Sequence, residues 1–138
     1  MGIRRKARVV ALQVLFEVDL VGHDAGESLA WRMDEVALPE EGVDFAGELV
    51  QGVLTNKDKI DSMIQTWAPA WPVSQIAVID RNILRLAIFE ILLNNKVPVK
   101  AAINEAVELA KTFGSENSPK FINGVLGTVS AQSSGERG

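Results

Sequence analysis

The sequence predicts an all-α protein, a compact bundle of six to seven helices in two helical subdomains. Apolar residues recur at the helical spacing along almost the whole chain, and no segment shows the apolar–polar alternation of a half-buried strand. The one linker dense in proline, APAWPVS, lies at mid-chain, where its prolines tend to end or exclude helix. We expect one domain over residues 1–131, made of an N-terminal half (1–68), a linker (69–73) and a C-terminal half (74–131), and then a frayed tail (132–138).

The composition fits an ordinary globular domain. The chain has 138 residues, of which 47% are hydrophobic and 23% charged, and a net charge of −4. It has no cysteine, which excludes disulfides, thiolate metal sites and cysteine nucleophiles. Its start is too charged for a signal peptide, and the most apolar run, ILRLAIFEILL, is interrupted by Arg85 and Glu90. We therefore expect a cytoplasmic protein that does not enter a membrane.

Four helices are expected before the linker. The first begins within IRRKARVVALQVLFEVDL and ends near Gly22. Ser28 is placed to cap a short second helix, LAWRMDEV. Apolar residues over 45–54 mark the third helix, and Asn56 is placed to cap the fourth, KDKIDSMIQTW.

Three more helices are expected after the linker. Asp80 is a candidate N-cap for RNILRLAIFEILLNN, which is apolar on nearly all sides and therefore predicts the central helix, ending before Pro98. The next helix, AAINEAVELAKTFG, ends at Gly114. Ser118 followed by Pro119 indicates the start of the last helix, KFINGVLGTVSA.

The last helix contains two glycines, Gly124 and Gly127. Each destabilises a helix interior by up to about 1 kcal/mol relative to alanine. We expect close packing against a neighbouring helix to be the reason for both.

Sequence patterns of catalysis are almost absent. His23, the single histidine, lies in a glycine-rich turn without a nucleophile nearby in sequence and is expected to be a solvated loop residue. The chain has no glycine-rich phosphate loop, no zinc-ligand spacing and no dinucleotide fingerprint. We therefore expect no enzymatic activity, no catalytic residue, no cofactor and no metal site.

A basic cluster, Arg4, Arg5, Lys6 and Arg8, stands at the start of the first helix. Cations at a helix N-terminus are disfavoured by a few tenths of a kcal/mol each, because the N-terminus carries a partial positive charge. Two interpretations are open from these residues alone. The cluster either contacts nucleic-acid phosphates or forms a solvated helix end.

Three segments resemble a known family. RRKARVVALQVLF, IDRNILRLAIFEI and VPVKAAINEAVELAKTFGSENSPKFINGVLG are similar, in this order, to the bacterial transcription antitermination factors of the NusB family. The resemblance implies an all-helical fold in two subdomains and a non-catalytic adaptor. Such a protein binds the boxA element of nascent transcripts, notably ribosomal RNA, together with the ribosomal protein NusE. Within the RNA polymerase antitermination complex it suppresses transcription termination.

The resemblance also implies RNA-binding residues. It places an arginine-rich motif at the basic cluster, and Gln13 lies on the same helix. Unpaired bases stack on aromatic rings, so aromatic residues near the linker and the last loop are candidates, although Trp67 and Phe121 also lie on apolar stripes typical of a core. Asn117 replaces an acidic residue of the family, a change that favours RNA. The predicted RNA-binding residues are Arg4, Arg5, Lys6, Arg8, Gln13, Trp67, Phe113, Asn117, Ser118, Lys120 and Phe121.

A partner surface is implied as well. NusE is expected to be basic, which suits the acidic surplus of this chain. The predicted partner-binding residues are Phe16, Asp80, Arg85 and Glu90. Two alternatives remain: a homodimeric protein-interaction module in which dimerisation hides the basic cluster, or an RNA-binding accessory domain like that of some ribosomal RNA methyltransferases.

Overall fold

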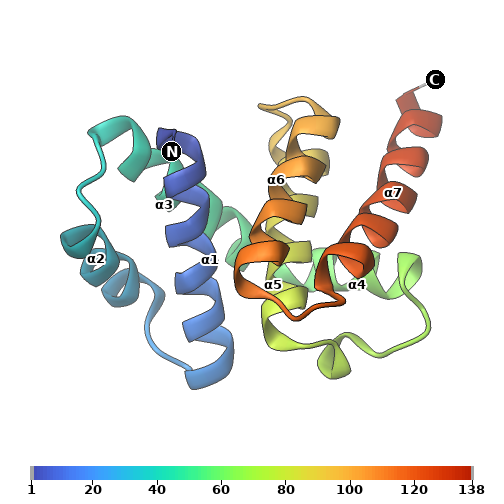
Figure 1. Ribbon diagram of the computed structural model, residues 1–138, viewed down its shortest axis with the longest axis horizontal. Helices are drawn as coiled ribbons and strands as arrows, with labels where there is room; N and C mark the ends of the chain where they lie inside the picture. Colours follow the sequence, from blue (N-terminus) through green and yellow to red (C-terminus); the bar gives the residue numbers. More distant parts are fainter. Residues whose placement is uncertain (1, 138) are drawn as a thin grey trace. The chain divides into compact units, whose positions relative to one another are not determined.

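A computed structural model describes residues 2–137 of the chain, with side chains described as far as residue 131. These residues form seven α-helices, one 3-10 turn and one π-helical segment, and they contain no strand, which confirms the all-α prediction (Figure 1). The chain divides into two compact units, Met1–Thr55 and Asn56–Gly138. The sequence predicts a division at the linker, residues 69–73, whereas the two units of the structure meet earlier in the chain, between Thr55 and Asn56. The side chains of 132–138 lie outside the described residues, so the fraying of this tail stays a prediction.

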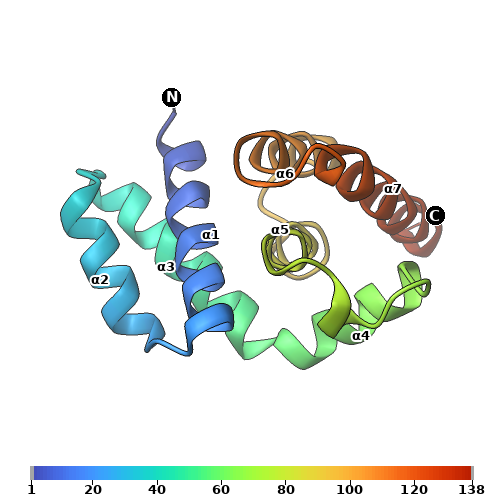
Figure 2. The same ribbon diagram turned by 60° about the horizontal axis from the view of Figure 1, so that its bottom comes forward.

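The first unit contains α1 (Ile3–Val21), α2 (Ala25–Glu35) and α3 (Glu40–Thr55). Helix α1 packs against both α2 and α3 (Figures 1 and 2). The predicted end of α1 is confirmed, since Gly22 adopts the left-handed conformation with φ 81° and donates its N–H to Val18. The core of this unit includes Ala11, Leu12, Leu15, Leu49 and Val50.

The start of α2 differs from the prediction. Asp24, not Ser28, is the N-cap, and its carboxylate accepts a hydrogen bond from the Glu27 N–H at 3.0 Å. The Ser28 hydroxyl instead donates to the carboxylate of Glu17 on α1. The other Glu17 oxygen lies 2.9 Å from Nδ1 of His23, whose side chain is 57% exposed, as predicted for a solvated residue. The hydrogen bond from Ser28, followed by that from His23, lowers the pKa of Glu17 below its ordinary value of 4.5.

The second unit contains α4 (Lys57–Trp67), the 3-10 turn η1 (Val73–Gln75), α5 (Val78–Ile88), the π-helical segment η2 (Phe89–Asn94), α6 (Val99–Phe113) and α7 (Ser118–Arg137). Helix α5 contacts α4, α6 and α7, and Figure 2 shows it end-on between α4 and the α6–α7 pair. This confirms the prediction of a central helix in the second half.

One expectation about α5 is wrong, and one feature of its continuation was not predicted. Asp80 is not an N-cap, because α5 starts after Ala77 and Asp80 is its third residue, where a carboxylate still meets the positive end of the helix. The predicted long helix also changes geometry at Phe89, where it becomes π-helical. It ends at Asn94, before Pro98, and its C-cap residue Asn95 has a left-handed φ of 55°.

The loop between α6 and α7 is closed by Ser118. Its Oγ accepts a hydrogen bond from the Ser115 N–H at 2.8 Å, so the side chain stabilises the loop instead of capping the last helix. A Cβ on Gly114 would lie 2.5 Å from Ser118, which explains the glycine at that position. The glycines inside α7 have no such reason: a Cβ on Gly124 or Gly127 would meet nothing within 4 Å, so the expectation of close helix packing is wrong.

Candidate nucleic-acid interface

The basic cluster lies at the start of α1, in the first unit. Arg4, Arg5 and Lys6 are exposed, whereas Arg8 is only 5% exposed. The first turn of α1 contains no acidic residue, and Gly2 at the N-cap provides no side-chain hydrogen bond. This helix end therefore combines exposed cations with N–H groups that the helix itself does not use, both of which attract an anion.

Phe45 of α3 holds two members of the cluster. The guanidinium carbons of Arg4 and Arg8 lie 5.4 Å and 5.3 Å from the centre of its ring, within the range of a cation–π contact. The two arginines are one helical turn apart and share a face of α1. One turn before Phe45, a Cβ on Gly42 would come within 2.9 Å of Ile3, so glycine allows α3 to approach the start of α1. Arg8 is thus largely a packing residue, and the exposed cluster is Arg4, Arg5 and Lys6.

Two further candidates lie along α1. Gln13, predicted to contact RNA, and Phe16, predicted to contact the partner protein, are both partly buried. Each keeps part of its side chain accessible, so both roles stay predictions.

The second unit carries two adjoining pockets. One, here called the linker pocket, has a volume of about 350 Å³ and lies between residues 67–71 and α7. Its walls include Trp67, Trp71, Ile76, Lys120, Phe121 and Gly124. The other, here called the loop pocket, lies beside the α6–α7 loop, and its lining includes Gln75, Asp80, Ser115, Asn117 and Ser118. Both pockets share Trp71, Ile76 and Phe121.

The loop pocket brings together residues predicted for different roles. Asn117, Ser118 and Phe121 were expected to contact RNA, whereas Asp80 was expected to contact the partner. Asp80 is only 8% exposed, and its Oδ1 is buried without a hydrogen-bond partner. An unpaired buried carboxylate is unfavourable, so this atom is suited to accept a hydrogen bond from a ligand.

Trp71 is a functional candidate that the sequence analysis missed. Its side chain is 59% exposed, and it lines both pockets, whereas Trp67 lines only the linker pocket and is partly buried. A large exposed aromatic in a proline-rich linker, outside any helical stripe, was the available signal. Phe113, predicted to contact RNA, is partly buried and lines neither of these pockets.

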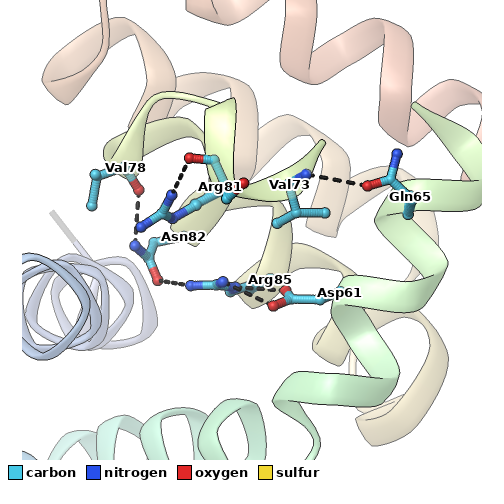
Figure 3. A network of polar contacts seen from close by, with 8 residues as sticks. Asp61, Gln65, Val73, Val78, Arg81, Asn82 and Arg85 are labelled. Atoms are coloured by element: carbon cyan, nitrogen blue, oxygen red, sulfur yellow. Dashed lines mark hydrogen bonds and ion pairs between the residues drawn. The ribbon is translucent and has the colours of Figure 1, made fainter. Parts of the chain in front are cut away.

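Gln65 of α4 fixes the backbone that carries Trp71. Its Nε2 donates a hydrogen bond to the Trp71 carbonyl oxygen at 3.2 Å. Its Oε1 accepts one from the Val73 N–H, also at 3.2 Å (Figure 3). The side chain thus holds the linker at two points.

Arg85 joins α4 to α5. Its Nε and one terminal nitrogen donate to the two carboxylate oxygens of Asp61 at 2.8 and 2.9 Å, and its other terminal nitrogen donates to Asn82 at 3.3 Å (Figure 3). Arg85 is only 5% exposed, so its side chain makes these contacts inside the second unit. Glu90, in η2, is also buried. The predicted contacts of Arg85 and Glu90 with a partner protein stay predictions.

Two other classes of site are absent from the described residues. No helix within residues 2–137 is both long and apolar enough to cross a bilayer. Among residues 2–131, whose side chains are described, no three acidic, histidine or cysteine side chains gather as metal ligands.

Comparison with known proteins gives the family. Residues 5–131 match the NusB family. The transcription antitermination protein NusB of Dehalococcoides mccartyi (strain CBDB1) is 55% identical over 127 residues, which cover 92% of this chain and 89% of that protein.

Two solved structures have the same fold. One is NusB of T. maritima, with a TM-score of 0.83 and 34% identity, covering 89% of this chain and 87% of that one. The other is a crystal structure of the antitermination factors NusB and NusE in complex with double-stranded RNA, with a TM-score of 0.85 and 28% identity, covering 94% of this chain and 96% of that one. The chain therefore belongs to the NusB family.

Proposed function

We propose that this chain is a cytoplasmic transcription antitermination factor that acts as an adaptor without catalysis. It binds single-stranded boxA RNA together with NusE, within the antitermination complex of RNA polymerase. The observation that carries the proposal is the match to NusB over residues 5–131, with a solved relative held in complex with NusE and RNA.

The exposed cations at the start of α1 support RNA binding. Arg4, Arg5 and Lys6 are exposed, and the first turn of α1 contains no acidic residue. Each phosphate that they neutralise releases counterions and makes binding salt-dependent. This chain has a net charge of −4, so the favourable field for RNA is local to this helix end.

Asp80 supports a basic partner. Its buried Oδ1 gains a hydrogen bond when a lysine or arginine of the partner enters the loop pocket, which removes the unfavourable free energy of an unpaired carboxylate. Phe16 offers partly exposed apolar surface on α1 for the same partner. Arg85, whose guanidinium is held by Asp61, stays a predicted partner contact.

The test is fluorescence anisotropy of a labelled boxA RNA, with and without NusE, at several salt concentrations. We expect NusE to raise the affinity. Arg4→Ala/Arg5→Ala should weaken RNA binding and flatten the dependence of log K on log salt by about 0.7 for each phosphate that the variant no longer neutralises.

Lys57→Ala/Lys59→Ala is the matched control, because it removes two exposed lysines from α4 in the second unit. It should bind RNA as the parent does. If the parent binds no RNA even with NusE, the proposed function is wrong. A dimer in light scattering would then favour a protein-interaction module.

A further inference from the structure

Helix α2 has one exposed face. Its other side packs against α1, and Figures 1 and 2 show α2 at one edge of the first unit. The exposed face, here called the α2 face, consists of Glu27, Ala30, Trp31 and Asp34. These four residues share one side of the helix because they are spaced by three or four positions.

Trp31 lies in the middle of the α2 face. It is 53% exposed, although tryptophan is usually largely buried. The guanidinium carbon of Arg32 lies 4.9 Å from the centre of its ring, which is a cation–π contact. The indole of Trp31 therefore already meets one guanidinium group, and its exposure leaves ring surface accessible to another cation.

Carboxylates lie on both sides of Trp31. Glu27 is one helical turn before it and Asp34 one turn after it, and neither side chain has an ion-pair partner among the described residues. Seven positions of helix, about 10 Å, separate the two carboxylates, which is too far for both to bind one metal ion. Their spacing instead suits several cationic groups carried on one chain.

The stability of α2 does not account for these charges. A helix C-terminus carries a partial negative charge that disfavours carboxylates, yet Asp34 lies in the last turn of α2. The surrounding segment has the same sign, because residues 24–48 contain eight acidic residues and one arginine, a net charge of −7 in a chain of −4. A positively charged partner would offset this local excess.

We propose that the α2 face binds an arginine- and lysine-rich segment of a partner protein. One cation of the segment stacks on Trp31, and others pair with Glu27 and Asp34. Nucleic acid does not fit this face, because the carboxylates repel its phosphates. The proposal goes beyond the proposed function, which places RNA at the start of α1 and NusE at the loop pocket.

The test is the binding of a fluorescein-labelled peptide of alanine and arginine to the full chain saturated with NusE. Arginine stands at every third or fourth position of the peptide, so its cations share one helical face. NusE occupies the proposed partner site at Asp80, so the experiment measures a second basic-segment site. We expect saturable binding that weakens as salt is added, and no binding of a twin peptide with glutamate in place of arginine.

Variants of the α2 face locate the peptide. Trp31→Ala should weaken its binding about 2- to 5-fold, the effect of one exposed cation–π contact. Glu27→Gln/Asp34→Asn should weaken it about 2- to 30-fold, the effect of two exposed ion pairs. The matched control is Asp58→Asn/Glu116→Gln, which removes two exposed carboxylates from the second unit and should bind the peptide as the parent does.

NMR identifies the indole that the peptide contacts. The chain has three tryptophans, and the indole N–H signal that is missing from Trp31→Ala belongs to Trp31. The peptide should shift this signal and leave those of Trp67 and Trp71 in place. An acidic face that only meets solvent predicts no selective shift. RNA binding of Trp31→Ala with NusE should equal that of the parent, since the α2 face contacts neither.

Three outcomes would overturn the proposal and leave the proposed function standing. The first is no saturable binding, or equal weakening by the two carboxylate variants, which would mean attraction to net charge alone. The second is binding to the free chain that is lost with NusE, which would assign the α2 face to NusE. The third is a shift of the Trp71 signal instead of the Trp31 signal, which would place the peptide at the pockets of the second unit.

Discussion

The basic cluster and the linker pocket are built in different ways. The cluster consists of sequence neighbours on one helix, held by the ring of Phe45, and its attraction for RNA is electrostatic. The linker pocket joins residues 67–76 to residues 120–125, and its proposed contribution is stacking. The difference teaches that a charged surface needs one helix and a single supporting ring from its neighbour, whereas a stacking pocket depends on the packing of its whole unit.

Asp61→Ala tests that dependence most strongly. Removing the carboxylate leaves the Arg85 guanidinium buried and without its bidentate partner, so we expect the free energy of unfolding to fall by about 3 kcal/mol. Urea denaturation measures the loss. Asp58→Ala, an exposed change on the same helix, should cost less than about 0.5 kcal/mol. Equal effects of the two variants would mean that the ion pair does not hold α4 to α5.

Phe45→Leu tests how far the cluster depends on its single ring. Leucine keeps most of the apolar volume but removes the ring face beneath Arg4 and Arg8, so we expect a loss of about 1–2 kcal/mol in stability. Phe89→Leu, a comparable change in the second unit, is the control. RNA binding that survives Phe45→Leu in full would show that Arg4 needs no such support.

The sequence predicted the helices well because their apolar periods are local. The ends of α1 and α4 match, and α5 is central as its apolar surface indicated. The N-cap predictions failed at polar side chains that have more than one possible hydrogen-bond partner. Ser28 donates to Glu17 on another helix, and Ser118 accepts from the Ser115 N–H in the loop before α7.

The candidate sites show the same limit. The basic cluster could be identified from four residues of the sequence, but the burial of Arg8 depends on Phe45, which lies on another helix. Trp71 was missed because only the fold brings it beside Phe121. Gly124 was assigned to helix packing, and only the empty space around it overturned that expectation.

Salt dependence separates the two surfaces in one experiment. Arg4→Ala/Arg5→Ala should reduce the slope of log K against log salt by about 0.7 for each phosphate left without its cation. Trp71→Ala should lower affinity at every salt concentration and leave the slope nearly unchanged, because stacking releases few counterions. A reduction of the slope by the same amount in both variants would contradict the assignment of phosphate contacts to the cluster and stacking to the linker pocket.

Glu17→Gln is expected to have the smallest effect, and it concerns the unit that carries the cluster. Hydrogen bonds from Ser28 and His23 lower the pKa of Glu17 in the folded state, so the carboxylate stabilises the fold above its ordinary pKa of 4.5. That contribution is lost as pH falls below 4.5 through the lowered pKa. Thermal unfolding should therefore show a lower Tm for Glu17→Gln near neutral pH and a gap to the parent that closes in acid. Glu35→Gln, an exposed change on α2, should have the Tm of the parent at every pH. RNA binding of Glu17→Gln at neutral pH should be unchanged, because the hydrogen bond to Ser28 holds α1 to α2 without contacting the exposed arginines.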